Sequence, residues 1–412
     1  MDVSGDNEQT AVAGYASVHL VAHSYLGSLW IALDQRHGLP GKPVLLRRVQ
    51  LSEQTRSEAF QRMACAGRDA MALSHENVLP VVDVLLQADS LALAYEYVEA
   101  EPLRALQSWA THRGLAFPVG VSLRLGMDLL RGVRALHGTL LGWPSAPPYG
   151  GLSPDSILVS RDGRTRLCDP LVSSCATMLE GMSLNVAKLA YTAPEQAYAT
   201  APLGAASDIF TCGVLLWELL AGNRLLTGPR AIVERKLLEH DLPSLRSQLP
   251  SGVEVSDRLV ALVERCLASD AGRRPQSPEE LASELEQCGH QIASLEQVAA
   301  FVSELAGARF DQRRMTVRSL PSLRVAAARP NATPVASNSG SDSNSDNGNS
   351  RRIPLPGKIP GGSAAIRSPA SSLGLGTAAA SARDGAAQPR LPLPGNHPFA
   401  RLAVPNSPKV VE

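Results

Sequence analysis

The chain has 412 residues, 44% hydrophobic and only 4% aromatic, which is enough for two or three ordinary domains with mainly aliphatic cores. Lysine plus arginine and aspartate plus glutamate number 39 each, so no net charge favours nucleic acid or an anionic membrane surface. The six cysteines form no C-x-x-C pair, which argues against a disulfide framework or a zinc site. These totals favour a globular protein with reduced thiols.

The ends of the chain and its longest apolar run bear on location. Residues 1–14 are polar and acidic and lack the basic start and apolar run of a secretory signal. The apolar run from Ile209 to Gly222 is shorter than the roughly 18 residues that a membrane-spanning helix needs. We therefore expect a flexible N-terminus, no membrane span and a cytoplasmic location.

Residues 15–98 contain a series of short, strand-like segments. They read YASVHLVA, SLWIAL, PVLLRRVQL, VLPVVDVLL and LALAYEYV, each bounded by Gly, Pro, Asp or Ser. One helical stretch, at about 56–72, interrupts them. The pattern predicts a small, mostly antiparallel sheet with a single helix against it.

Helical patterns dominate residues 101–290. Apolar residues recur every three or four positions and mark one buried helix face at Val121, Leu125, Leu129, Val133 and Leu136. Between the helices, SILVS and TRLCD flank Asp162-Gly163, which predicts a hairpin. Further helices are predicted at 208–221, 257–268 and 278–288.

The remaining residues divide into two parts. Apolar residues at helical spacing predict an amphipathic extension over 291–316, which either packs back on the domain or forms a partner surface, and packing back is the commoner outcome. Residues 320–412 are rich in Pro, Ser, Gly and Ala and cannot bury enough apolar area to order, so we expect a disordered tail.

Three segments of the helical part carry a resemblance to a known family. They are YTAPEQ at 191–196, SDIFTCGVLLWELLAG at 207–222 and CLASDAGRRPQSPEEL at 266–281. With them, residues 15–290 resemble a bacterial eukaryotic-like serine/threonine protein kinase domain. The resemblance implies an α+β, two-lobed protein-kinase-like fold. A small antiparallel-sheet N-lobe with one helix (15–98) would precede a larger helical C-lobe (101–290).

The same resemblance assigns structural roles. It implies that Glu195 pairs with Arg274, and that Asp208 accepts hydrogen bonds from the backbone of the catalytic loop. Each role gives a buried polar group a partner, so these residues keep the helical lobe foldable.

The nucleotide-covering loop departs from the family pattern. Of the glycines that the family uses there, only Gly27 is present, while Ala22 and Ser24 fill the first two glycine positions. Side chains at those positions hinder the close approach of backbone N–H groups to phosphates.

The strand lysine and its partner are also replaced. The lysine position is Arg47, whose planar fork does not substitute for a compact ammonium. The helix glutamate aligns with Ala66, so Arg47 loses its expected partner. Leu45 stands where the family has a small residue beneath the adenine, and its bulk would crowd a purine at about 1–3 kcal/mol.

The catalytic loop lacks its reacting groups. His-Arg-Asp becomes Tyr149-Gly150-Gly151, so Gly151 occupies the position of the catalytic aspartate and has no side chain to accept a proton. Ser156 replaces the metal-binding asparagine. Asp169 remains from Asp-Phe-Gly and is followed by Pro170 and Leu171. It is either a weak metal ligand or a hydrogen-bonded loop aspartate, and the second interpretation is favoured.

We therefore predict a catalytically inactive protein kinase-like domain, a pseudokinase, that regulates or scaffolds another protein in signalling. The expected partner is a protein, with an active kinase or its substrate as candidates. Five residues would line the nucleotide cleft if ATP bound: Gly27, Arg47, Tyr97, Val98 and Leu158. Asp169 would be the metal ligand for Mg²⁺, although the substitutions argue against both cofactors.

Two alternatives stay open. The first is a weak or atypical ATP-dependent serine/threonine kinase, in which Arg47 contacts phosphate, Asp169 binds metal and Asp155 replaces the missing base. The second is ATP binding without transfer, as a structural switch. The hinge sequence Glu96-Tyr97-Val98 favours it, while Leu45 and the substituted loop oppose it.

Overall fold

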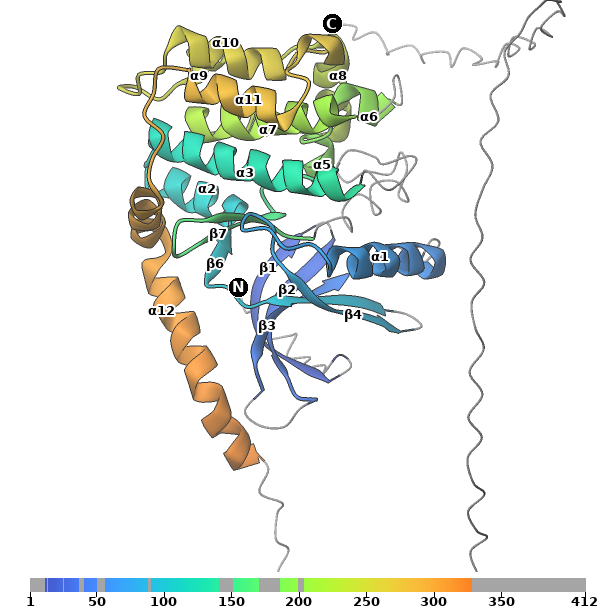
Figure 1. Cartoon of the computed structure of the whole chain (residues 1–412). Helices are drawn as coiled ribbons and strands as arrows, with labels where there is room; N and C mark the ends of the chain where they lie inside the picture. Colours follow the sequence, from blue (N-terminus) through green and yellow to red (C-terminus); the bar gives the residue numbers. More distant parts are fainter. Residues whose placement is uncertain are drawn as a thin grey trace, which may run out of the picture. The chain divides into compact units, whose positions relative to one another are not determined.

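The computed structural model describes residues 12, 14–24, 26–36, 41–49, 56–87, 90–140, 151–169, 186–198 and 204–327. They form a small strand-rich lobe and a larger helical lobe, and one long helix runs beside both (Figure 1). Residues 97–99 connect the last strand of the small lobe to the first short strand of the large one.

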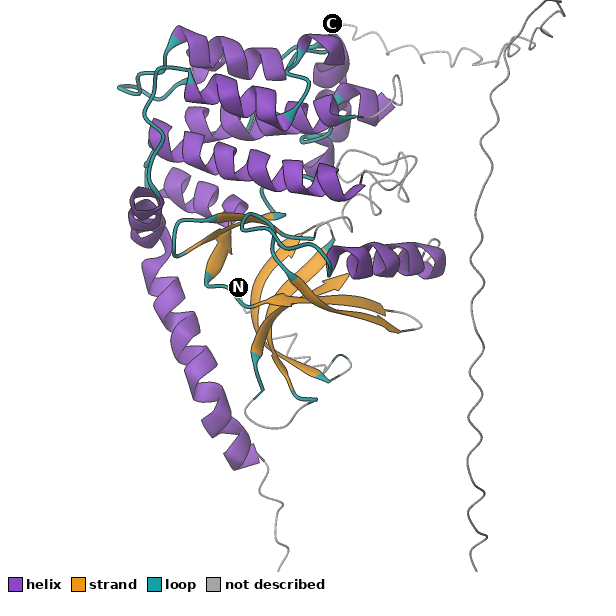
Figure 2. Ribbon diagram, in the orientation of Figure 1, coloured by secondary structure: helices purple, strands orange, loops and turns teal. Residues whose placement is uncertain are grey.

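The N-lobe is a five-stranded antiparallel sheet in the order β1-β2-β3-β5-β4. Its strands are β1 (Tyr15–Ser24), β2 (Gly27–Asp34), β3 (Pro43–Val49), β4 (Val81–Gln87) and β5 (Ser90–Glu96). The helix α1 (Arg56–Ala70) packs against β4 and β5 (Figure 2). These elements correspond to the predicted strands and single helix.

Both faces of the central strands are buried. Because successive side chains of a strand point to opposite faces, Val44 and Leu46 join one apolar cluster. Leu45 and Val49 join another, which continues into the C-lobe. Burial on both sides explains why the sequence of β3 reads as a nearly continuous apolar run. Arg47 interrupts that run on the inner face, although it is only 1% exposed.

The C-lobe is built around α7 (Ala205–Ala221), a helix that is apolar on all sides and buried along almost its whole length. The helices α3, α10 and α11 pack against it. The C-lobe elements before and after α7 are α2 (Leu103–His112), α3 (Val119–Leu140), α5 (Val186–Leu189), α6 (Pro194–Tyr198), α8 (Arg230–Glu239), α9 (Leu245–Gln248), α10 (Asp257–Cys266), the 3₁₀ helix η2 (Ala271–Arg273) and α11 (Pro278–Glu286). The Ser256 and Ser277 hydroxyls cap α10 and α11 by accepting from the third backbone N–H beyond them.

A second, three-stranded sheet lies between the lobes and consists of β6 (Ala100–Pro102), β7 (Ile157–Ser160) and β8 (Thr165–Leu167). The predicted hairpin at Asp162-Gly163 joins β7 to β8. Gly163 has a φ of 84°, and a Cβ there would lie 2.1 Å from the carbonyl oxygen of Leu295. Only glycine fits this turn, because the backbone at Leu295 passes so close to it.

Leu295 is the first residue of α12 (Leu295–Ala327), the long helix beside both lobes. Its first half packs on α2 and α3, and the rings of Phe117 and Phe301 meet at 4.9 Å between centroids. Arg113 donates to the carbonyl oxygens of Glu304 and Leu305 at 2.7 and 3.0 Å. The amphipathic segment therefore packs back on the domain.

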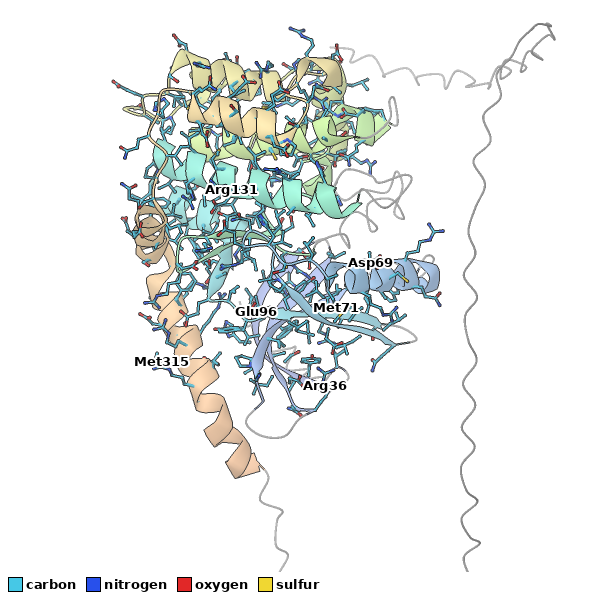
Figure 3. All side chains as sticks on the ribbon, viewed as in Figure 1. Arg36, Asp69, Met71, Glu96, Arg131 and Met315 are labelled. Atoms are coloured by element: carbon cyan, nitrogen blue, oxygen red, sulfur yellow. The ribbon has the colours of Figure 1, made fainter. Side chains whose placement is uncertain are left out.

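Further along, α12 binds the connection between the lobes. Arg313 contacts Glu101 at 2.8 Å and also donates to the carbonyl oxygen of Ala100 at 3.0 Å. Arg314 contacts Glu99 at 2.6 Å. Met315, labelled in Figure 3, lies next to these arginines but is 65% exposed. The helix is thus tied to the interlobe segment by charged contacts on one of its faces.

The predicted fold class is confirmed: an antiparallel N-lobe with one helix precedes a helical C-lobe. The helix α12 differs from the segment predicted at 291–316, because it begins at Leu295 and ends at Ala327, inside the tail predicted from 320. Once formed, a helix gains one hydrogen bond per added residue, so it can extend past its apolar pattern. Residues 328–412 lie outside the described part. No helix in the described ranges is both long and apolar enough to cross a membrane.

The two adjacent arginines of α12 give a stability prediction. The side chains of Arg313 and Glu101 are 5% and 1% exposed, so Arg313→Met leaves a buried carboxylate with only the exposed Arg309, at 3.4 Å, and should cost about 3 kcal/mol of unfolding free energy. The matched variant Arg314→Met breaks a pair that is 39% and 22% exposed and should cost about 1 kcal/mol or less. Urea unfolding of both variants measures the difference, and equal losses would contradict the assigned role of Arg313.

Candidate functional site

The cleft between the lobes begins with the inner face of the N-lobe sheet. The register of β3 places Arg47 opposite Leu29 and Leu93, and places Leu45 opposite Tyr95. Because residues two apart share a face, Arg47 and Tyr95 both point from the sheet toward the C-lobe. In a mainly apolar cluster, these two side chains carry the polar groups available to the cleft.

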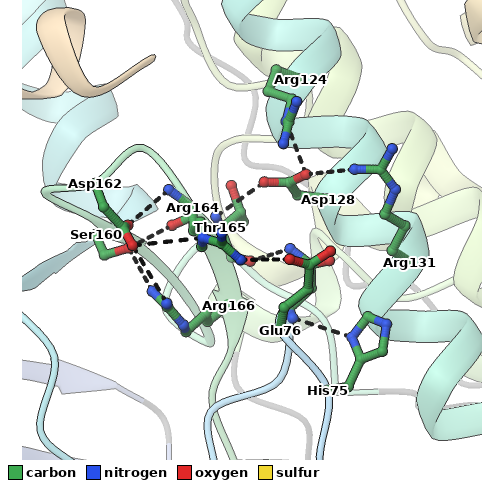
Figure 4. Close-up of polar contacts among 11 residues, drawn as sticks. His75, Glu76, Arg124, Asp128, Arg131, Ser160, Asp162, Arg164, Thr165 and Arg166 are labelled. Carbon is green, nitrogen blue, oxygen red and sulfur yellow. Dashed lines mark hydrogen bonds and ion pairs between the residues drawn. The ribbon is translucent and has the colours of Figure 1, made fainter. Parts of the chain in front are cut away.

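The C-lobe side of the cleft is supplied by the loop that follows β8. The hairpin leading to this loop is fixed by Asp128 of α3, whose side chain is 1% exposed (Figure 4). Asp128 Oδ1 accepts from Arg124 and Arg131 at 3.0 and 3.1 Å, and Oδ2 accepts from the backbone N–H of Thr165 at 3.3 Å. The turn itself is closed by Asp162, which accepts from the N–H of Arg164 at 3.1 Å.

Arg47 and Asp169 form a buried ion pair across the cleft. Arg47 Nε donates to Asp169 Oδ1 at 3.1 Å, and Nη2 donates to Oδ2 at 2.8 Å. The hydroxyl of Tyr95 donates to Asp169 Oδ1 at 2.6 Å. All three residues are at most 2% exposed. Both oxygens of the carboxylate are therefore held by protein donors, through the paired geometry in which a guanidinium binds a carboxylate most strongly.

The β1–β2 turn is tied to the same arginine. Arg47 Nη1 donates to Ser24 Oγ at 3.1 Å and to the Gly27 carbonyl oxygen at 3.4 Å. Ser24 Oγ also accepts from the N–H of Leu26 and donates to the Gly27 carbonyl. Gly27 has a φ of 123°, a conformation that favours glycine. The turn that would cover phosphates is thus bonded onto Arg47 inside the protein.

Burial and charge act together on the titratable groups of this cluster. Burial opposes the charged form of Arg47, yet the carboxylate of Asp169 outweighs it and raises the pKa of the guanidinium. Burial, followed by the charge of Asp169, raises the pKa of Tyr95 well above its ordinary value, so the phenol keeps the proton it donates. Burial likewise raises the pKa of the Cys168 thiol. Arg47 therefore stays charged, and Tyr95 and Cys168 stay neutral, at physiological pH.

Asp169 also has an unusual backbone, with a φ of 59°. A non-glycine residue in this left-handed region costs on the order of 1–3 kcal/mol and persists only where its surroundings fix it. Here the hydrogen bonds to both carboxylate oxygens fix it. Pro170 and Leu171, which follow, lie outside the described residues.

In the described part of the catalytic loop, residues 151–156, a glycine stands at the position of the family's proton-accepting aspartate. Gly151 is buried, and Tyr149 and Gly150 lie outside the described residues. Ser156 Oγ is used within the loop: it accepts from the N–H of Ser153 at 3.0 Å and donates to nearby carbonyl oxygens. Asp155, weighed as a replacement base, is ion-paired with Arg104 at 3.0 Å.

The predicted nucleotide-contacting residues differ in how deeply they are buried. Leu158 is buried in the main core, against which Tyr97 and Val98 are partly buried. Leu45, opposite Tyr95, is 3% exposed. The position of the family's helix glutamate is Ala66, which is fully buried in α1. Arg47 therefore has partners, but they differ from those of the family pattern.

The residues assigned structural roles lie deeper in the C-lobe. Arg274 contacts Glu195 through both nitrogens, at 2.7 and 2.9 Å, and Ser207 donates to the same carboxylate. Burial alone would raise the pKa of Glu195, but the hydrogen bonds from Arg274 outweigh burial, so the pKa is lowered overall. Asp208 contacts His137 at 2.7 Å. Part of the loop whose backbone it was expected to hold, residues 141–150, lies outside the described ranges.

The cleft does not fit the cofactors that the fold implies. A magnesium ion requires free carboxylate or carbonyl oxygens, and the oxygens of Asp169 are engaged by Arg47 and Tyr95. Within the part of the chain that the structure describes, no group of three or more His, Cys, Asp or Glu side chains could hold a metal ion. Arg47, whose guanidinium would contact the phosphates, is engaged by the same carboxylate.

Sequence reasoning missed two members of this cluster. Tyr95 is not among the candidate site residues of the sequence analysis, and Ser24 is treated there only as a replaced glycine. A signal for both existed, because each introduces a hydroxyl next to the buried charges of Arg47 and Asp169. Buried charges require hydrogen-bond partners, so new hydroxyls at cleft positions were the candidates to supply them.

Comparison with known proteins agrees with this fold. A family model described as "Protein kinase domain" matches residues 41–285, more than half of the 412 residues, and the chain therefore belongs to the protein kinase family. The match begins at the start of β3 and leaves out β1, β2 and α12.

Two of the similar proteins are bacterial serine/threonine-protein kinases. The chain is 28% identical over 243 residues to pkn2 of Myxococcus xanthus, covering 56% of this chain and 27% of that protein. It is 25% identical over 288 residues to PknA of Mycobacterium tuberculosis, covering 64% of this chain and 63% of that protein. It thus spans less than two thirds of either relative.

A solved structure shares the fold. A mutant form of the PknI kinase domain from Mycobacterium tuberculosis superposes with a TM-score of 0.52 at 21% identity, covering 70% of this chain and 100% of that one. The likeness concerns the two-lobed architecture.

The buried cluster predicts a large effect of a small substitution. Asp169→Asn keeps the shape but leaves the Arg47 charge buried and uncompensated, so the unfolding free energy should fall by about 3–5 kcal/mol. Asp155→Asn, in a pair that is 28% and 20% exposed, should cost about 1 kcal/mol or less. Removing the other charge as well, as in Arg47→Met with Asp169→Asn, should recover much of the loss, because asparagine still accepts from Tyr95 and tolerates the left-handed backbone. Chemical denaturation checks this, and a loss that is no smaller in the double variant would contradict the pairing.

Proposed function

We propose that this kinase-family domain is a pseudokinase, a non-catalytic module that regulates or scaffolds another protein in signalling. The observation that carries the proposal is the ion pair of Arg47 with Asp169, completed by Tyr95. Phosphoryl transfer needs a cation on the phosphates and a carboxylate on the metal. In this chain the two groups at those positions neutralise each other inside the protein.

Two further observations support the proposal. Gly151 stands where the family has its proton-accepting aspartate, and Asp155 is engaged by Arg104. The family match also omits the β1–β2 hairpin, the part that covers the nucleotide in the family. The domain keeps the C-lobe pair of Glu195 and Arg274. The residues that stabilise the family's fold are therefore present, whereas those that react in the family are replaced. We further propose a cytoplasmic location and a protein partner.

Nucleotide binding gives the direct test. We expect ATP with Mg²⁺ or Mn²⁺ to leave the melting temperature unchanged, because Arg47 and Asp169 are already bound to each other. A nucleotide at 100 times its dissociation constant would instead add about 2.7 kcal/mol of stability. PknA, handled in parallel, is the positive control for the assay.

A phosphotransfer assay on the same preparations addresses the alternative of a weak serine/threonine kinase. We expect no metal-dependent incorporation of phosphate into the chain or a general protein substrate. Incorporation that rises with Mg²⁺ or Mn²⁺ and disappears in Asp169→Ala, shown to be folded by circular dichroism, would replace the pseudokinase by an atypical enzyme.

A further inference from the structure

Outside the cleft, a cluster of arginines lies where α12 meets the connection between the lobes. Arg309 and Arg313 of α12 share one carboxylate, that of Glu101, at 3.4 and 2.8 Å. Arg314, the next residue along the helix, binds the separate carboxylate of Glu99 at 2.6 Å. Two guanidinium groups therefore face a single carboxylate at Glu101, and positive charge exceeds negative charge at this point.

Arg313 has one donor left over in this cluster. Its side chain is 5% exposed, and its terminal nitrogens bind Glu101 and the carbonyl oxygen of Ala100. Its Nε is buried and has no hydrogen-bond partner in the described part of the chain. Burial lowers the pKa of this guanidinium, the charge of Glu101 opposes that effect, and the charge of Arg309 adds to it, so the pKa is lowered overall. A buried donor without a partner is destabilising, so the site has room for one more acceptor.

A basic group of the N-lobe sheet adjoins the same two arginines. Burial lowers the pKa of the His19 imidazole in β1, and the charges of Arg313 and Arg309 lower it further. Positive charges have this effect because they oppose the protonation of a neighbouring base. The positive charge of α12 therefore acts on the N-lobe in spite of Glu101.

Thr316 brings a hydroxyl to the adjoining turn of α12, and its side chain is partly exposed. Its Oγ1 donates to the carbonyl oxygen of Gln312 at 3.1 Å, so the oxygen lies over the preceding turn of the helix. Residues three positions apart are neighbours on a helix surface, and Arg313 stands three positions before Thr316. The helix continues to Ala327, so an anion at Thr316 is clear of the last turn, where the helix dipole would oppose it.

We propose that Thr316 is a phosphorylation site, and that its phosphoryl group binds Arg313 and Arg309 and thereby fixes α12 on the connection between the lobes. A phosphothreonine carries a charge of about −1.5 to −2 with three acceptor oxygens, and opposite an arginine cluster it forms one to three charge-assisted hydrogen bonds. The planar fork of a guanidinium matches a phosphate. The phosphoryl group supplies both the missing negative charge and an acceptor for Arg313 Nε.

A separate ATP-dependent serine/threonine protein kinase supplies this group. Thr316 Oγ1 forms a bond to the γ-phosphorus of ATP, the bond from that phosphorus to the bridging oxygen breaks, ADP leaves, and the hydroxyl proton passes to the base of the modifying enzyme. Arg313 and Arg314 precede the acceptor by three and two positions, a charge pattern that an acidic substrate groove selects. Both arginines are engaged while α12 is docked, so the enzyme acts on a locally opened helix end, and the modified helix then closes on the body.

Incubation of the full chain with ATP, Mg²⁺ and an arginine-directed protein kinase tests the acceptor. We expect mass spectrometry to find phosphate on Thr316, and none there in Thr316→Ala. Absence of phosphate from Thr316 in the parent chain would overturn the assignment of the site.

The contact is tested with Thr316→phosphothreonine, introduced into the full chain by genetic encoding. We expect amide hydrogen exchange over residues 317–327 to slow by about tenfold, which corresponds to about 1.4 kcal/mol of added opening free energy and is of the order of one charge-assisted hydrogen bond. Unchanged or faster exchange would overturn the inference.

His19 gives a second readout, which a merely stiffer helix would not move. A phosphoryl group on Arg309 and Arg313 reduces the positive field that lowers the pKa of His19, so that pKa should rise in an NMR titration of the modified chain. An unchanged or lower pKa would contradict the contact.

Two further chains localise the effect. Ser303→phosphothreonine, at an exposed position of α12 with alanines three and four positions before it, should change neither readout, and equal slowing there would assign the effect to helix charge in general. In Arg309→Gln, at an arginine 49% exposed, phosphorylation should raise the pKa of His19 less than in the parent chain. An undiminished rise would overturn the shared site.

These outcomes are separable from that of the proposed function. The encoded phosphothreonine needs no activity of the chain itself, whereas ATP binding is measured on the unmodified chain. If ATP with Mg²⁺ stabilises the chain, the pseudokinase proposal fails while both readouts still report on Thr316. If neither readout moves and nucleotide has no effect, the phosphorylation proposal fails and the pseudokinase proposal stands.

Discussion

The contact on which the cleft depends is the buried pair of Arg47 and Asp169, which joins the N-lobe sheet to the C-lobe hairpin. Two charges inside a protein are stable only if each compensates the other and their remaining hydrogen-bonding groups are occupied. Tyr95 and Ser24 occupy them. Under the proposed function, this arrangement takes the place of nucleotide and metal, because each charge is neutralised by a partner within the chain.

A second set of charges ties α12 to the connection between the lobes. Arg313 and Arg314 of α12 bind Glu101 and Glu99, which flank the connection between the lobes. In an active kinase the lobes must open and close around nucleotide. In this chain the pair of Arg47 and Asp169 joins the two lobes directly, and α12 is bound to the connection between them.

The fold could be predicted from the sequence because its signals are local. The Asp162-Gly163 turn and the apolar spacing of α3 are each read from residues that are close together in the sequence. The same holds for the segments that carry Glu195 and Arg274. The substitutions at Arg47 and Gly151 were visible by position alone. The pairing of Arg47 with Asp169 was not, because 122 residues separate them and nothing local ties a strand arginine to a loop aspartate.

The most direct measurement follows the side-chain Nε–H of Arg47 by nitrogen NMR, assigned through Arg47→Lys. A buried donor to Asp169 should give a resonance that exchanges slowly with water at neutral pH, and neither Mg²⁺ with ATP nor paramagnetic Mn²⁺ with ATP should shift or broaden it. Rapid exchange, or selective broadening by Mn²⁺ with ATP, would show that the charges are open to nucleotide and metal and would contradict the account.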